Sequence, residues 1–231
     1  MKKFISFILC IIMCLTISMP AFAVDVTSSH NNTVMDANFY DDANCFVDNG
    51  IVYFQRNQLI GQSGNIKNYQ VDTVSLIPAE GKSSSDIVNV FNEYKSTKNT
   101  NTRASSTIGP IWDSSVSVQT NCTITYSSYE DSAGVGFAKL TGFSGNYTIH
   151  DNHVRVDRLY VEYGSTGLGV GAYYNQYDDM FISSSSWSYS APSSWQYVTT
   201  DNASYFIGTT YTFSISHMGG STWTSTVQNN L

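Results

Sequence analysis

The stretch that decides the fold runs from Val116 to Tyr126 and reads VSVQTNCTITY. Its apolar side chains recur at every second position, with Ser, Thr, Asn or Gln beside them. Successive side chains of a β-strand point to opposite faces, so this alternation predicts a half-buried strand. Cys122 shares the apolar positions, and we therefore expect its side chain to face the core.

The same two-residue period recurs through the rest of the chain. Alternating segments around Trp187, Trp195 and Tyr211 bring the number of strands after residue 109 to about eight at regular spacing, which is typical of an antiparallel sandwich or barrel. The sequence therefore predicts a mainly β fold, with an antiparallel β-sandwich over residues 109–231.

A turn at 151–152 sets one register prediction. A two-residue loop there pairs Ile149 with Val154, so that apolar side chains meet on one buried face. The same register pairs His150 with His153 and places their Cβ atoms about 4.5–5.5 Å apart, close enough for two imidazoles to share a metal ion. These two histidines are the candidate metal ligands.

Two histidines alone do not make a metal site, because zinc usually takes at least three protein ligands. Asp151 or His217 could complete the set only if the fold brings it near. The alternative is that His150 and His153 are polar residues flanking an exposed turn. The sequence has no H-E-x-x-H motif and no phosphate-binding loop, and it indicates no cofactor.

Whether apolar residues occupy the odd or the even positions of a strand gives two further predictions. A three-residue loop at 218–220 pairs Ile215 with Trp223, whereas a two-residue loop would mix apolar and polar faces. Near Asp157-Arg158 the apolar residues also change from even to odd positions. Such a change indicates a β-bulge, in which one extra residue is inserted into the strand.

The N-terminal part has a different pattern. Residues 24–96 predict a small α/β segment with two strands and one helix, over 84–96, whose apolar residues recur at i, i+3, i+4 and i+7. Ser83, with Asp86 three residues later, forms a variant of the capping box. Residues 97–108 are polar, offer almost nothing to bury, and are interpreted as a linker to the sandwich.

The first 23 residues have the three parts of a secretory signal peptide. Lys2 and Lys3 supply a positive start, an apolar run follows, and Ala21 and Ala23 offer small residues before the cut. The apolar run is shorter than the roughly 20 residues of a membrane-spanning helix. We expect residues 1–23 to be removed, leaving a secreted, extracellular protein with no membrane partner.

Charge restricts the partners of this chain. It carries 18 acidic and 11 basic residues, a net charge of −7 at pH 7, and loses Lys2 and Lys3 with the signal peptide. An acidic protein is repelled by nucleic-acid phosphates and by anionic membranes. We therefore expect no nucleic-acid partner.

Two cysteines follow the signal peptide, Cys45 and Cys122. In an oxidising compartment a single pair predicts one disulfide, which would join the N-terminal segment to the sandwich. The alternative, a catalytic thiol, has no family signature around either cysteine.

A glycine-rich stretch offers a candidate ligand-binding surface. A turn near residues 164–165 would set Tyr160 opposite Gly169 or Gly171, on the outer side and beside Glu162 and Tyr173. A ring over bare backbone, with polar groups at its edge, makes a flat platform that can stack a sugar ring or dock another protein. The alternative is that the ring only covers glycines as a structural device.

These features favour a non-catalytic module that binds an extracellular glycan or protein. The alternative is a small secreted hydrolase acting on polysaccharide, with Glu162 as one carboxylate and a second that the sequence does not identify. The sequence has no G-x-S-x-G motif and assigns no catalytic residue. A deep cleft with two carboxylates would favour the enzyme, and a shallow aromatic face would favour the binding module.

Overall fold

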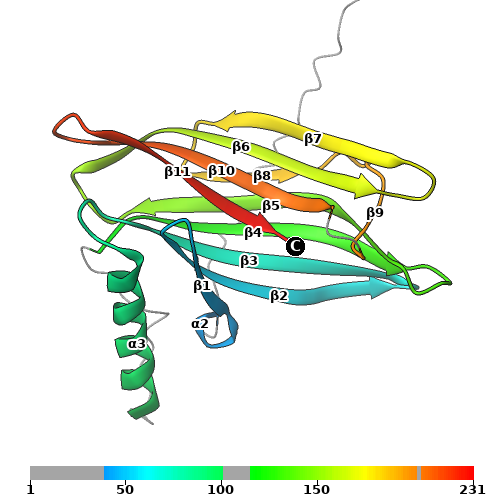
Figure 1. Cartoon of the computed structure of the whole chain (residues 1–231), viewed down its shortest axis with the longest axis horizontal. Helices are drawn as coiled ribbons and strands as arrows, with labels where there is room; N and C mark the ends of the chain where they lie inside the picture. Colours follow the sequence, from blue (N-terminus) through cyan, green and yellow to red (C-terminus); the bar gives the residue numbers. More distant parts are fainter. Residues whose placement is uncertain (1–38, 101–114, 202–203) are drawn as a thin grey trace, which may run out of the picture.

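The computed structural model describes residues 39–100, 115–201 and 204–231. The expected signal peptide, residues 1–23, and positions 101–108 of the expected linker lie outside the described residues. Within them, two antiparallel sheets form two layers, with two helices beside the larger sheet (Figure 1). The predicted mainly β, sandwich fold is therefore confirmed.

The larger sheet contains seven strands: β1 (Asn44–Asp48), β2 (Ile51–Ser63), β3 (Ile66–Pro78), β4 (Val116–Glu130), β5 (Gly136–Ile149), β8 (Ser186–Ser190) and β9 (Val198–Thr199). Their order is β1-β2-β3-β4-β5-β8, and β9 also pairs with β5. The two strands predicted in the N-terminal segment therefore lie in the same sheet as strands of the predicted sandwich.

The smaller sheet contains four strands: β6 (Val154–Leu168), β7 (Tyr173–Ile182), β10 (Phe206–His217) and β11 (Thr222–Asn230). Their order is β11-β10-β6-β7, so β7 and β11 are its edges. The described part of 109–231 contributes eight strands to the two sheets, in agreement with the sequence prediction.

The decisive stretch, 116–126, begins β4, which lies between β3 and β5. Its later apolar side chains are buried in the core between the sheets. At its start a bulge reverses the alternation, because Ile77 pairs with Val118 but Pro78 pairs with Val116. Val116 therefore packs on the other face of the sheet, toward the helices.

The helices α2 (Phe39–Asp42) and α3 (Ser84–Thr100) form a second, smaller core with the outer face of the larger sheet. Phe91 of α3 packs edge-on against Phe54 of β2, with ring centroids 4.5 Å apart. Phe54 alternates along β2 with residues that face the other sheet, so this strand is buried on both faces.

The start of α3 is as predicted and its end is not. The backbone N–H and the hydroxyl of Ser83 both donate to the Asp86 carboxylate at 2.8 Å, which is the expected cap. The helix continues to Thr100, four residues beyond the predicted end at residue 96. Positions 97–100 of the expected linker are therefore helical.

The register predicted near the C-terminus is confirmed. Ile215 pairs with Trp223 across the three-residue loop. Arg158 and Val156 pair with successive residues of β10, which leaves Asp157 as an extra residue in β6. This is the predicted bulge.

The predicted hairpin between Ile149 and Val154 is wrong. β5 lies in the larger sheet and β6 in the smaller one, so the chain crosses between sheets through residues 150–153, which we call the arch. Ile149 pairs with Val118, and Val154 pairs with His217. Val154 is buried in the core between the sheets, whereas Ile149 is 38 % exposed at the end of β5, so the two side chains do not meet on one buried face.

A polar side chain joins the two sheets inside the core. Asn229 of β11 is fully buried, and its amide nitrogen donates to the carbonyl oxygens of Val71 at 3.3 Å and Cys122 at 3.1 Å. Its side-chain oxygen accepts a hydrogen bond from the Thr73 hydroxyl at 3.0 Å. One side chain of the smaller sheet thus makes three hydrogen bonds to the larger sheet, which fixes how β11 sits on it.

The predicted disulfide between Cys45 and Cys122 is wrong, because both cysteines are free. Cys45 pairs with Phe54 and so lies on the helix side of the larger sheet. Cys122 is fully buried in the core between the sheets. The two thiols therefore lie on opposite faces of one sheet, beyond the reach of a disulfide.

We expect iodoacetamide to modify Cys45 and to spare Cys122 while the protein is folded. The thiolate is the reacting form, and burial raises the pKa of Cys122 to about 12. Burial also raises the pKa of Cys45, but Lys95 opposes this rise and the residue is exposed. Peptide mass spectrometry with and without urea measures both sites. If neither thiol reacted until a reductant was added, the two would be bonded after all.

Candidate functional site

Large ring side chains gather on the outer face of the smaller sheet, along its edge strand β7. Tyr173, Tyr177 and Phe181 recur every four residues, so they share one face of the strand. They are 61 %, 65 % and 63 % exposed. Tyr160 of β6 lies directly opposite Phe181. We call these four side chains the aromatic face.

Tyr160 is held in place by its neighbours. Its ring centroid lies 5.1 Å from that of Phe181, with the planes tilted by 46°. The Arg158 guanidinium lies over the same Phe181 ring, 5.1 Å from the centroid. Ring–ring and cation–π contacts of this kind favour fixed orientations. These rings are therefore positioned before any ligand binds.

Two carboxylates lie among the rings. Glu162 of β6 pairs with Asp179 of β7 on the same outer face. The Tyr160 hydroxyl donates a hydrogen bond to Asp179, which is the largest cause of the raised pKa of Tyr160. Tyr163 points inward instead, donates to Asp178 at 3.3 Å, and has its pKa raised to about 12, mainly by burial.

The structure brings Tyr160 and Glu162 together and places Tyr173 at the far end of the same face. Sequence reasoning missed Tyr177 and Phe181, which are the most exposed rings near Tyr160. The signal that could have identified them is the alternation of aromatic with polar residues along β7.

The predicted turn near 164–165 is wrong, because β6 continues to Leu168, which is exposed rather than buried. Tyr160 therefore does not lie over a glycine. A different glycine is covered: a Cβ on Gly164 would lie 3.3 Å from the Cβ of Tyr177 and 3.5 Å from the Phe206 ring. Tyr177 thus both covers backbone and remains open to solvent.

The side chains of the aromatic face on β7, and those of Glu162 and Asp179, are exposed. A cleft of about 450 Å³ lies elsewhere, between the turn at 48–50 and β11, with Trp223 and Gln228 in its wall. Glu162 and Asp179 do not line it. The paired carboxylates are therefore displayed on a surface and are not enclosed by that cleft.

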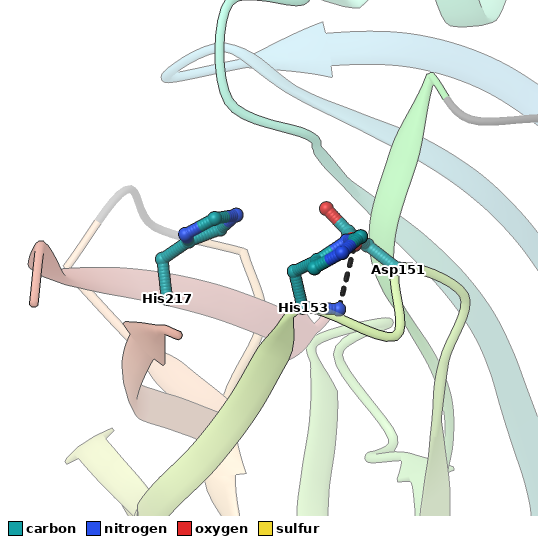
Figure 2. A group of neighbouring side chains, drawn as sticks. All are labelled: Asp151, His153 and His217. Atoms are coloured by element: carbon teal, nitrogen blue, oxygen red, sulfur yellow. Dashed lines mark hydrogen bonds and ion pairs between the residues drawn. The ribbon is translucent and has the colours of Figure 1, made fainter. Parts of the chain in front are cut away.

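A second group of candidate side chains lies at one end of the sandwich, where the arch meets the end of β10 (Figure 2). Asp151 and His153 belong to the arch, and His217 is the last residue of β10. The two imidazole centroids are 5.8 Å apart, with their planes 22° from parallel. His153 Nδ1 lies 3.2 Å from Asp151 Oδ1. We call these residues the histidine cluster.

His150 does not belong to the histidine cluster, so the predicted pairing of His150 with His153 is wrong. The error follows from the wrong hairpin prediction, because residues 150–153 form the arch between the sheets and not a turn between two paired strands. His150 Nε2 lies 3.1 Å from Gln119 Oε1 of β4, and burial lowers the pKa of His150. His217 takes its place because the pairing of β6 with β10 brings His217 beside the arch.

Comparisons of the chain with family models, with curated proteins and with solved structures find no match. Within the described residues, no helix combines the length and the apolar character that crossing a membrane requires. A function must therefore be inferred from the side chains themselves.

Proposed function

We propose that the protein is a non-catalytic extracellular module that binds glycans through the aromatic face. The observation that carries this proposal is the outward row of β7, in which Tyr173, Tyr177 and Phe181 alternate with Asn175 and Asp179. Aromatic rings stack against the apolar C–H faces of sugars. Amide and carboxylate groups hydrogen-bond to sugar hydroxyls. A row with both kinds of group can contact a glycan at several points.

The spacing of the rings indicates the class of glycan. Rings at every fourth residue of an extended strand are about 13 Å apart. This separation suits several consecutive units of a linear chain better than a single sugar. Glu162 and Asp179 add negative charge to the face, which repels acidic polysaccharides. The ligand that fits is a linear glycan without acidic groups.

Export is part of the proposal. The charged, apolar and small-residue sections of 1–23 support a signal peptide. The net charge of −7 supports a partner other than nucleic acid or an anionic membrane. A protein partner on the same rings is the alternative within the binding class, since exposed aromatic residues also anchor protein interfaces.

Polysaccharide hydrolysis is the second candidate, and one observation supports it. Glu162 and Asp179 are cross-strand neighbours, and the carboxylates of retaining glycosidases are about 5–5.5 Å apart. Binding is favoured because this pair lies on an open face, whereas small-molecule sites are usually concave. Glu162→Gln separates the two: it abolishes release of reducing sugar by a hydrolase and leaves a stacking site largely intact.

We expect the protein to bind at least one linear, non-acidic glycan on an array. Tyr160→Ala and Tyr177→Ala should each weaken that binding about tenfold, because one ring contact contributes about 1–1.5 kcal/mol. Phe46→Ala is the matched control, since Phe46 is an exposed ring on β1 of the other sheet. Titration calorimetry with the best glycan of the array measures all four proteins.

Two outcomes would overturn the proposal. One is an array on which no glycan binds. The other is an equal loss of affinity in Phe46→Ala and Tyr177→Ala, which would place the glycan away from the aromatic face. Capture of a protein ligand that Tyr160→Ala abolishes would support the protein-binding alternative.

A further inference from the structure

We propose that Asp151, His153 and His217 bind a divalent transition-metal ion of the zinc type. The three residues come from two segments more than 60 positions apart, which the fold brings together at one end of the sandwich (Figure 2). Tyr160 lies six residues further along β6 than Val154, about 20 Å away along the strand. This site is therefore separate from the aromatic face.

The backbone holds the two segments together. Val154, directly after the arch, pairs with His217 in the ladder between β6 and β10. The backbone N–H of Met218 donates to the carbonyl oxygen of His153 at 2.8 Å. His217 is fixed in turn by its own N–H, which donates to Ser221 at 2.8 Å. These backbone contacts hold the two imidazoles side by side.

The carboxylate is also oriented in advance. Asp151 Oδ1 accepts a hydrogen bond from the backbone N–H of His153 at 2.9 Å. This contact turns the carboxylate toward the His153 ring, whose Nδ1 is 3.2 Å away. An ion pair needs only one imidazole beside a carboxylate. The second imidazole, of His217, also interacts electrostatically with Asp151, and it adds a third ligand atom to a metal site.

The distances are close to those that a metal requires. One ligand atom from each residue lies within 4.8 Å of the other two. Zinc ligands lie about 2.0–2.2 Å from the ion in a tetrahedral arrangement, so two of them are about 3.3–3.6 Å apart. Closing the remaining gap of up to about 1.5 Å requires a side-chain rotation. The His153 side chain is 64 % exposed and has room for it.

The donor set selects the class of metal. Two imidazole nitrogens and one carboxylate oxygen suit zinc, and also nickel and copper, which bind nitrogen ligands more tightly than calcium or magnesium do. Three protein ligands leave at least one coordination position for water or for an atom of another molecule. The ion would join the arch to the loop after β10 at the exposed end of the sandwich.

The test is a titration of the purified protein with zinc alone. The protein carries no polyhistidine tag and has Cys45 replaced by serine, because an exposed thiol also binds zinc. We expect one ion per chain by calorimetry. Zinc at about 100 times its dissociation constant should raise the melting temperature by about 5–10 °C. Calcium should neither bind nor displace the zinc.

The variants locate the ion. His153→Ala, His217→Ala and Asp151→Asn should each weaken zinc binding at least tenfold and remove the thermal shift. His150→Ala is the matched control, because His150 belongs to the same arch but contacts Gln119 instead of the cluster. His153→Ala keeps the proposal testable if another variant unfolds, since this exposed side chain contributes little to the core.

The proposal is wrong if the protein binds no zinc at zinc concentrations up to the millimolar range. It is also wrong if His153→Ala and His217→Ala bind zinc as tightly as His150→Ala does, because the ion would then lie elsewhere. These outcomes are independent of the glycan array, so the failure of one proposal does not affect the other.

Discussion

Replacing Trp187 by alanine is expected to lower the free energy of unfolding by about 3–5 kcal/mol. Trp187 lies in the short strand β8 and is only 7 % exposed. Its ring covers Gly145 so closely that a Cβ there would lie 2.6 Å from the ring. Its indole N–H donates to the Tyr211 hydroxyl of the smaller sheet at 3.4 Å. One side chain thus fills the space between the sheets, and its loss leaves a cavity.

Urea unfolding followed by circular dichroism measures this effect. The midpoint should fall while the dependence on urea stays constant. Trp187→Phe is the control, since it keeps a ring over Gly145 and removes the N–H donor; it should lose less than half as much stability. A loss below about 1 kcal/mol for Trp187→Ala would contradict the packing that the structure shows.

Replacing Asn229 by leucine should cost about 2–4 kcal/mol, although leucine has a similar size and is more apolar. The reason is that the Asn229 side chain makes three hydrogen bonds from β11 to the larger sheet. Leucine leaves the Thr73 hydroxyl without its acceptor and two carbonyl oxygens without these donors, in the interior of the protein. Each such loss costs about 1–3 kcal/mol when no water replaces the partner, and the favourable burial of the leucine side chain offsets part of the sum.

The decisive point is whether Asn229→Leu lowers or raises the free energy of unfolding. If only apolar burial mattered at this position, Asn229→Leu would stabilise the protein. Asn230→Leu is the matched control, because Asn230 is the next residue on the same strand and is not buried; its effect should stay within about 0.5 kcal/mol. Equal midpoints for the two variants would contradict the role given to Asn229.

The part of the fold that sequence predicts well is the part with one buried face. In 116–126 the alternation of apolar with polar side chains predicts the strand, although not the bulge that turns Val116 to the other face. In the C-terminal hairpin the same alternation predicts the register as well. The bulge at Asp157 was predictable for the same reason, since an extra residue reverses the alternation.

The predictions made from the sequence were wrong where the choice between two topologies depends on tertiary packing. The apolar pattern fits a hairpin that pairs Ile149 with Val154, but in the arch between the sheets Val154 is buried and Ile149 is exposed. An apolar residue at the end of a strand does not indicate which sheet carries it or whether it is buried. The disulfide failed similarly: Cys122 was correctly predicted to face the core, but the face occupied by Cys45 depends on where β1 joins the sheet.

The same contrast between local alternation and tertiary packing explains which residues of the candidate sites were predicted from the sequence. Tyr160 and Glu162 were identified because local alternation places them on the outer face. Tyr177 and Phe181 were missed because their strand begins after a turn that was misplaced. The partnership of His153 with His217 depends on β6 pairing with β10, which no local pattern specifies.

The edge position of β7 has one more consequence. Within the described sheets this strand pairs with β6 alone, so one side of its backbone has no neighbouring strand. Such an edge can recruit the same edge of a second molecule and begin aggregation. Asp178 and Asp179 lie in the middle of β7, so two molecules meeting there would crowd carboxylates of both chains together. Their mutual repulsion would oppose such pairing along this edge.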